Sequence, residues 1–187
     1  QVLPFRFLAA VSVAPRFAGD LEAAMLRNLD GQPKIAGLTV LLIDVSGSMD
    51  EVLSKRSDLR RVEAACGLAI LARERCAQCR VFSVSDRLVE IPAYRGLALS
   101  TAIATSQPHG GTYLGRAVAT LNAETWDRLV VITDEQSHDP VPGPARQGYL
   151  FNVATERPGV GYGPWTHIDG LSERVFDYLV EAEREAS

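Results

Sequence analysis

Unbroken apolar runs and segments with helical spacing alternate along this chain, and together they predict its architecture. These runs lie in segments 39–43, 128–133 and 148–154, in which the polar residues are Thr39, Arg128, Thr133 and Asn152. Because a strand that is buried on both faces needs an apolar residue at nearly every position, these runs predict parallel strands inside a sheet. Two shorter runs, 80–85 and 87–92, meet across Asp86. So short a connection predicts an antiparallel pair whose second strand lies at the edge of the sheet.

Segments with helical spacing separate these runs. Residues 62–75 are apolar on nearly every face, which predicts a helix that is buried against the sheet. Residues 97–107, the segment after Thr112 and the amphipathic stretch around Phe176 predict further helices. The alternation predicts an α/β fold, with a doubly wound, mostly parallel central sheet, one antiparallel edge strand and helices on both faces.

Three other segments stand outside this alternation. Before the first strand, apolar residues recur at helical spacing on both sides of Pro15, which predicts an N-terminal helical segment that ends at Gly31. Residues 50–61 mix acidic and basic side chains, and this pattern predicts a solvated loop and the start of a helix. Residues 134–147 are proline-rich and close to the minimum length for a parallel crossover, so we expect an irregular loop there.

Oxygen-bearing side chains follow two of the buried strands. Asp44, Ser46 and Ser48 directly follow the first run in an Asp-x-Ser-x-Ser pattern, Asp134 ends the second run, and Thr112 opens a helix after paired glycines. Carboxylate and hydroxyl oxygens are hard donors, and a set of low total charge suits Mg²⁺ or Mn²⁺. The Asp-x-Ser-x-Ser turn supplies only part of an octahedral shell. The predicted metal site therefore also takes Thr112 and Asp134.

This signature resembles the von Willebrand factor A (vWA) domain and its metal-ion-dependent adhesion site. The resemblance implies a Rossmann-like fold and carries the metal-binding role to Asp44, Ser46, Ser48, Thr112 and Asp134. In that family the serines and the threonine can contact the ion, and the aspartates act directly or through water. A carboxylate from a partner often takes the open position, so the resemblance implies a module that binds a protein partner or an acidic ligand.

The first 33 residues resemble the end of the helical-repeat module of the TROVE family, the Ro ribonucleoproteins, in segments 3–10 and 21–25. In that family a ring of helical repeats binds small non-coding RNA, and a vWA domain closes the ring. The resemblance implies a helical segment at residues 1–33, which is the tail of an upstream helical-repeat module, and a vWA domain at residues 34–187. Small RNA is then expected to bind through the missing upstream module. Tyr113 departs from the family, which often places Asp or Asn after the threonine.

Charge and cysteine content limit the other classes of function. The 19 basic residues are outnumbered by 23 acidic ones, and the densest basic group, Lys55–Arg61, is interrupted by Asp58. This balance excludes the global basic surface of a dedicated nucleic-acid binder. The three cysteines are odd in number and clustered, which favours a reducing compartment over a disulfide framework. No signal peptide or membrane-spanning run is visible, so we expect a cytoplasmic chain cut from a longer protein.

Two alternatives to this interpretation remain open: a Mg²⁺-dependent hydrolase, and a vWA adhesion module unrelated to RNA. A hydrolase needs a positioned base and a charge clamp, for which Glu135 and the arginines near residue 60 are the candidates. Neither serine of the Asp-x-Ser-x-Ser turn lies in a G-x-S-x-G elbow, so we expect no enzymatic activity. His109, His138 and His167 are expected in loops after strands, and we do not assign them to the metal because oxygen ligands already account for it.

Overall fold

A six-stranded sheet forms the centre of the molecule in the computed structural model, which describes residues 4–54, 57–154, 163–169 and 174–185. The strand order is β5-β4-β1-β6-β7-β8, and only β5 runs antiparallel to its neighbour. The strands are β1 (Ile35–Asp44), β4 (Cys76–Val84), β5 (Leu88–Ile91), β6 (Arg128–Thr133), β7 (Gln147–Asn152) and β8 (Thr166–Asp169). The predicted parallel sheet and its antiparallel edge strand are confirmed.

The strand β1 lies between β4 and β6 and is buried on both faces over its second half. Leu41 and Ile43 pack into the core on one face of the sheet, whereas Val40 and Leu42 pack into the core on the other. Successive side chains of a strand point to opposite faces, so an unbroken apolar run is what a strand between two helical layers requires. This explains why the position of β1 was readable from its sequence.

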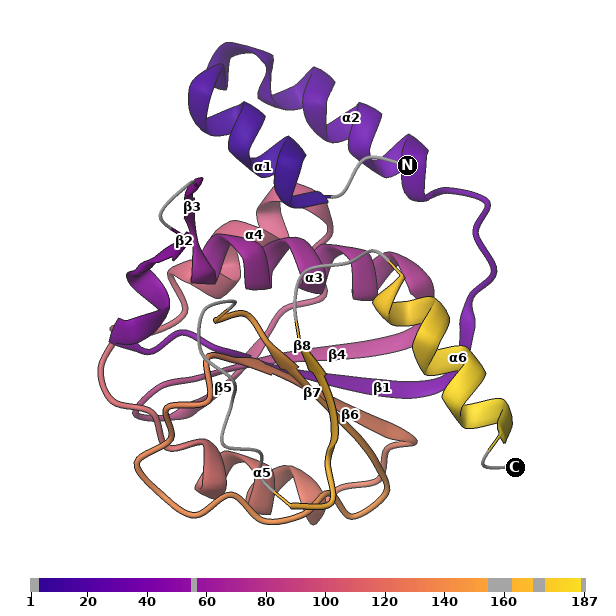
Figure 1. The fold of residues 1–187 in the computed structure, drawn as a ribbon. Helices are drawn as coiled ribbons and strands as arrows, with labels where there is room; N and C mark the ends of the chain where they lie inside the picture. Colours follow the sequence, from indigo (N-terminus) through magenta and orange to yellow (C-terminus); the bar gives the residue numbers. More distant parts are fainter. Residues whose placement is uncertain (1–3, 55–56, 155–162, 170–173, 186–187) are drawn as a thin grey trace.

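Helices cover both faces of the sheet, as predicted (Figure 1). The core on one face includes residues of α3 (Arg61–Arg75), α4 (Gly96–Ala104) and α6 (Val175–Glu185). The core on the other face includes residues of α5 (Leu114–Asn122). None of the helices within the described ranges is long and apolar enough to cross a membrane.

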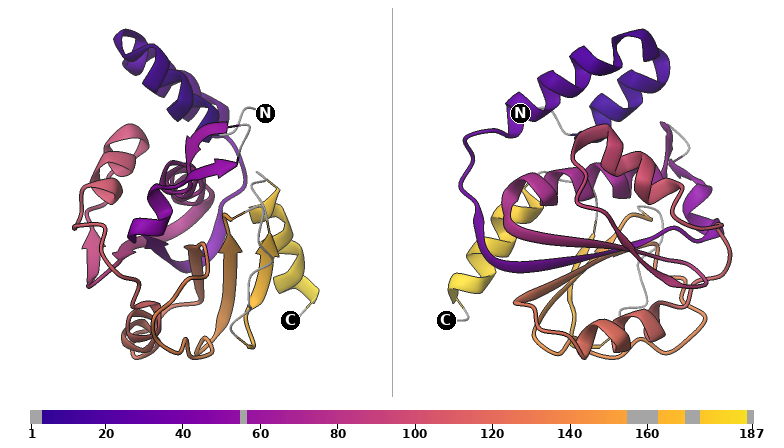
Figure 2. Two further views of the ribbon diagram at one scale, coloured as in Figure 1. Left: turned by 60° about the vertical axis from the view of Figure 1, so that its left-hand side comes forward. Right: turned by 180° about the vertical axis from the view of Figure 1, so that it is seen from behind.

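The N-terminal segment is helical, as predicted, and forms an outer layer over α3 and α4 (Figure 2). It consists of α1 (Pro4–Val13), the short helix η1 (Pro15–Phe17) and α2 (Ala18–Leu29). Leu8, Met25 and Leu29 are buried in the same core as α3. A Cβ atom on Gly67 of α3 would lie 2.9 Å from the backbone nitrogen of Phe5, so a glycine is what lets α1 approach α3 this closely. The assignment of residues 1–33 to the tail of an upstream helical-repeat module stays a prediction.

The structure corrects two local predictions. The segment at residues 50–61 ends at the start of α3, as predicted, but the expected solvated loop before it contains an antiparallel hairpin. The hairpin consists of β2 (Val52–Ser54) and β3 (Ser57–Arg60) and follows the short helix η2 (Gly47–Asp50). His167 was expected in a loop but lies in β8, because the backbone of β7 offers a parallel partner to this short alternating segment. The irregular connection after β6 is confirmed, since no helix interrupts residues 134–146.

Candidate metal centre

Asp44 ends β1 at the carboxyl edge of the sheet and is fully buried. Its Oδ1 accepts a 2.9 Å hydrogen bond from the backbone N–H of Ser46, and its Oδ2 accepts a 2.7 Å hydrogen bond from the hydroxyl of Thr133. Burial raises the pKa of Asp44 to about 6, and the neighbouring Asp134 adds to the rise, although the hydrogen bonds from Ser46 and Thr133 oppose it. A cation at this position would relieve the cost of burying the carboxylate charge.

The two serines lie on the turn that follows Asp44. The Oγ atoms of Ser46 and Ser48 are 3.3 Å apart, so both hydroxyls point to the same place. Between them, the backbone N–H of Gly47 donates a 3.0 Å hydrogen bond to the carbonyl of Gly110. A Cβ atom on Gly47 would lie 3.4 Å from the carbonyl oxygen of His109, which shows how closely the two loops approach. The turn therefore presents its hydroxyls beside the loop that carries Thr112.

Thr112 lies in that second loop and is 2% exposed. Its backbone N–H donates to Nδ1 of His138 at 3.2 Å, and its carbonyl accepts a 2.8 Å hydrogen bond from the backbone N–H of His138. Ser85, at the end of β4, donates its hydroxyl to the carbonyl of Gly111 at 2.9 Å and accepts the N–H of Gly110 at 2.9 Å. The backbone of the loop is thus held from both sides.

Asp134 follows β6, which pairs with β1, and its side chain is buried. Oδ2 accepts hydrogen bonds from Nη1 of Arg61 at 3.0 Å and from Nε2 of Gln136 at 3.1 Å. Oδ1 is buried and has no hydrogen-bond partner among the described residues. The same Nη1 of Arg61 donates to the carbonyl of Ser48 at 3.2 Å, so one nitrogen bridges the serine turn and Asp134.

Arg61 corrects the expectation of a solvated basic group near residue 60. It is 9% exposed, and Nη2 pairs with Glu51 at 3.0 Å. Lys55 and Arg56, the other end of this basic group, lie outside the described residues. Nothing in a single sequence distinguishes Arg61 from the exposed Arg60 beside it, because its burial depends on Asp134 of a distant strand.

The donor set fits a hard divalent cation. The structure brings Asp44, Ser46, Ser48 and Asp134 together at one edge of the sheet, and it places Thr112 in the loop bonded to the serine turn. The unpartnered Oδ1 of Asp134 and the two converging hydroxyls are oxygen donors with coordination capacity to spare. In the described part of the chain, no group of three or more His, Cys, Asp or Glu side chains offers a different metal site.

Glu135, the candidate base of a hydrolase, is turned away from solvent. Its side chain is 1% exposed and contacts Nε2 of His167 on β8. Its backbone has a positive φ of 61°, a conformation that is uncommon for a residue with a side chain. The contact with His167 could not be read from the sequence, because it depends on β8 joining the sheet.

The other two histidines hold the loops of the site rather than joining the donor set. Nδ1 of His109 lies 2.9 Å from both carboxylate oxygens of Asp50, which connects the glycine loop to η2. Burial lowers the pKa of His109, but the hydrogen bonds to Asp50 and to the carbonyl of Ala104 outweigh this effect and raise the pKa above its usual value. The ring of His138 stands edge-on to the ring of Tyr113, with centroids 5.8 Å apart.

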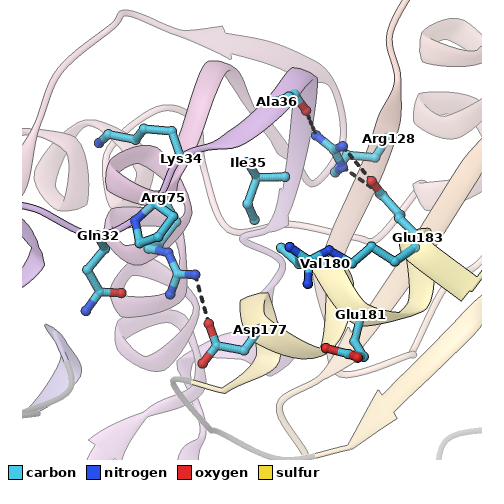
Figure 3. Close-up of a pocket in the computed structure, with 12 residues that line it drawn as sticks. Gln32, Lys34, Ile35, Ala36, Arg75, Arg128, Asp177, Val180, Glu181 and Glu183 are labelled. Carbon is cyan, nitrogen blue, oxygen red and sulfur yellow. Dashed lines mark hydrogen bonds and ion pairs between the residues drawn. The ribbon is translucent and has the colours of Figure 1, made fainter.

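A separate cavity of about 670 Å³ lies at the start of β1, which is the opposite end of that strand from Asp44. Arg128 of β6 makes paired hydrogen bonds of 2.7 Å to Glu183 of α6, and Arg75 of α3 contacts Asp177 of α6 at 2.8 Å (Figure 3). These ion pairs line the cavity and attach α6 to the sheet and to α3. They explain how the last helix is held in place, and they share no residue with the candidate metal centre.

The strand order, the antiparallel edge strand and the flanking helices are those of a vWA, Rossmann-like α/β fold. Among solved structures, the Ro (RSR) protein of Deinococcus radiodurans superimposes with a TM-score of 0.63 at 18% identity, over 83% of this chain and 35% of that chain. A von Willebrand factor type A protein from Catenulispora acidiphila matches with a TM-score of 0.49 at 16% identity, over 82% of this chain and 42% of that chain. This chain thus spans about a third of the length of the Ro protein. Comparisons with protein-family models and with curated proteins find no match.

Proposed function

We propose that this chain is a divalent-cation-dependent ligand-binding module of the vWA type. Asp44, Ser46, Ser48, Thr112 and Asp134 would hold Mg²⁺ or Mn²⁺ at the carboxyl edge of the sheet. The observation that carries the proposal is the buried Oδ1 of Asp134, which has no partner among the described residues. A buried carboxylate oxygen without a partner is costly, and a cation beside it would remove that cost.

The proposed ligand is an acidic group of a protein partner. Side-chain oxygens of this chain fill only part of the coordination shell of Mg²⁺, so water or a carboxylate from outside would complete it. The cation supplies the positive charge that a carboxylate recognises. The chain's own residues orient that cation: the bond between Thr133 and Asp44 fixes one carboxylate, and the bond between Gly47 and Gly110 fixes the serine turn.

We further propose that the module belongs to a Ro-type ribonucleoprotein. The structural similarity to the Ro protein and the helical layer of α1 and α2 before the sheet support this context. In that arrangement, small RNA binds to an upstream helical module, and the metal face of this chain contacts a protein partner. The three cysteines form no disulfide, which fits a cytoplasmic location.

We propose binding rather than hydrolysis at this site. Both candidate groups for hydrolysis already have charged partners within the chain, since Glu135 contacts His167 and Arg61 contacts Asp134. An assay for phosphatase activity on generic esters with Mg²⁺ or Mn²⁺ tests this choice. Metal-dependent turnover that is lost in Asp44→Asn would contradict it.

The test of cation binding is a calorimetric titration of Mn²⁺ into the wild-type chain and into the double variant Ser46→Ala, Ser48→Ala. Removing two hydroxyl ligands should weaken binding by at least about tenfold. Ser12→Ala is the control, because Ser12 is an exposed residue of α1 whose hydroxyl donates to the carbonyl of Leu8, away from the candidate centre. Equal affinity in all three proteins would show that the serines do not hold the ion.

A further inference from the structure

Arg61 brings a positive charge into the candidate metal centre. It is the first residue of α3, and its side chain is 11% exposed. Nη1 lies 3.0 Å from Oδ2 of Asp134, which directly follows β6. The contact therefore joins α3 to a strand that is distant in the sequence. A guanidinium is more weakly hydrated than an ammonium, so Arg is the basic residue best suited to a buried ion pair.

The charges of the centre depend on this arginine. Asp44 and Asp134 are both buried, and the closeness of Asp134 contributes to the raised pKa of Asp44. Asp134 gives one oxygen to Arg61 and leaves the other without a partner among the described residues. Arg61 therefore neutralises part of the negative charge that attracts a divalent cation, without using all of the coordinating capacity of Asp134.

Arg61 also has partners outside the proposed donor set. Nη1 donates to the carbonyl of Ser48 at 3.2 Å, and Nη2 pairs with Glu51 at 3.0 Å. Glu51 is largely exposed, with 63% of its side chain accessible. If the guanidinium left Asp134, these two acceptors could continue to hold it at the rim of the site.

We propose that Arg61 is an internal counter-cation that competes with a divalent metal ion for Asp134, so that Arg61 sets the metal affinity of the centre. This inference rests on the proposed function, because it concerns the same site. In the metal-free centre, Arg61 is bonded to Oδ2 of Asp134, while Oδ1 has no partner among the described residues. Cation binding then weakens the contact of Arg61 with Asp134 and leaves the guanidinium on the carbonyl of Ser48 and on Glu51, which it already contacts.

The experiment compares Mn²⁺ binding by the full chain in four forms: wild type, Arg61→Met, Arg61→Lys and Arg60→Met. Arg61→Met keeps most of the side-chain volume but removes the charge, so its affinity should rise by about tenfold or more over wild type. Arg60→Met is the matched control, because it removes the same charge from an exposed neighbour whose field is screened by solvent. Its affinity should change by less than about threefold. Arg61→Lys keeps the charge and should stay closer to wild type than Arg61→Met.

A second readout does not depend on affinity. In metal-free buffer, Arg61→Met leaves Asp134 without its cation, so its melting temperature should fall below that of wild type. Mg²⁺ should then raise the melting temperature of Arg61→Met more than that of wild type. A purely structural arginine would lower the melting temperature with and without Mg²⁺ by the same amount.

The outcomes separate this inference from the proposed function. Equal or weaker Mn²⁺ binding by Arg61→Met, beside clear binding by wild type, overturns the inference and leaves the metal site standing. Binding by Arg61→Met but not by wild type supports the inference. Absence of binding in both overturns the metal site and the inference together.

If Arg61→Met does not fold, ¹⁵N-labelled wild-type protein decides the matter. The Nε–Hε resonance of Arg61, identified by its loss in Arg61→Lys, should shift as Mg²⁺ is added. Nε of Arg61 is buried without a hydrogen-bond partner among the described residues, so its resonance reports directly on movement of the guanidinium. A resonance that stays in place up to the highest Mg²⁺ concentration overturns the inference.

Discussion

The hydroxyl of Thr133 donates a 2.7 Å hydrogen bond to Oδ2 of Asp44, and this bond joins the carboxyl ends of β6 and β1. The two strands pair in parallel register from Thr39 with Arg128 to Ile43 with Ile132. Parallel pairing therefore delivers Asp44 and the residue after Thr133, which is Asp134, to the same edge. The geometry of the candidate metal centre follows from the register of the sheet.

Asp44→Asn should remove Mn²⁺ binding while preserving the fold. Asparagine has nearly the same shape as aspartate, but it lacks the negative charge and one of the acceptor oxygens that a hard cation needs. Calorimetry should show a loss of at least about tenfold in affinity. Asp20→Asn is the control, because it removes one carboxylate from the exposed surface of α2. A similar loss in both variants would mean that overall charge, rather than coordination, governs binding.

In the metal-free protein, the contribution of Asp44 to stability should fall as the pH rises from about 4 to about 6. Burial raises the pKa of Asp44 from 3.8 to about 6, so the folded state holds this proton more tightly than the unfolded state. The contribution of Asp44 is therefore lost as the pH rises through that window, by an amount on the order of 3 kcal/mol.

Urea unfolding in the presence of a chelator measures this effect. Subtracting the unfolding free energy of Asp44→Asn from that of wild type removes the contributions of the other titrating groups. This difference should fall as the pH rises through the window and level off above it. A difference that is constant from acidic to neutral pH would contradict the buried, neutral form of Asp44.

Glu183→Gln should destabilise the protein by about 2–3 kcal/mol. Arg128 is 5% exposed, and Glu183 accepts two hydrogen bonds from it, so the variant leaves a buried guanidinium without its carboxylate. Contacts of Arg128 with the carbonyl of Ala36 and the hydroxyl of Thr39 limit the loss. Glu181→Gln on the exposed side of the same helix should change stability by less than about 0.5 kcal/mol. Equal unfolding midpoints in urea would refute the role of this pair in holding α6.

Gly67→Ala should disturb the packing of α1 on α3. The new Cβ atom would lie 2.8 Å from the Cβ atom of Phe5 and 2.9 Å from its backbone nitrogen, so the whole of α1 must shift. Overpacking of this kind costs about 1–3 kcal/mol. Gly19→Ala is the matched control, because its Cβ atom meets no other atom within 4 Å and alanine favours a helix. Thermal unfolding should rank Gly67→Ala below Gly19→Ala, and the reverse order would contradict the close approach of the two helices.

This chain alone should bind structured small RNA poorly. Affinity for RNA comes largely from phosphate contacts by basic side chains, and here 19 basic residues face 23 acidic ones. Arg61 is not available for such contacts because it is buried against Asp134. A gel-shift titration at physiological salt checks this expectation. Tight, saturable binding that disappears on charge reversal at Arg56 and Arg60 would place RNA recognition in this chain instead.

The sequence by itself determined the architecture and the order of the candidate ligands. Apolar residues at every position of the run before Asp44 require burial on both faces, and a parallel sheet between helices is the structure that provides it. Once the strand positions are known, their carboxyl ends must share one edge. For this reason Asp44 and Asp134 could be assigned to a common site although they lie far apart in the chain.

Only the tertiary structure decided which charged side chains pair with one another at that site. Arg61 looks like its exposed neighbour Arg60 in sequence, and it differs because folding places Asp134 within hydrogen-bond distance. His167 faces Glu135 because β8 adds to the edge of β7, which a four-residue segment cannot specify alone. Patterns along a sequence encode which face of an element is buried. Contacts between charged side chains depend on distances between elements, and those distances exist only once the whole sheet and its helices have packed.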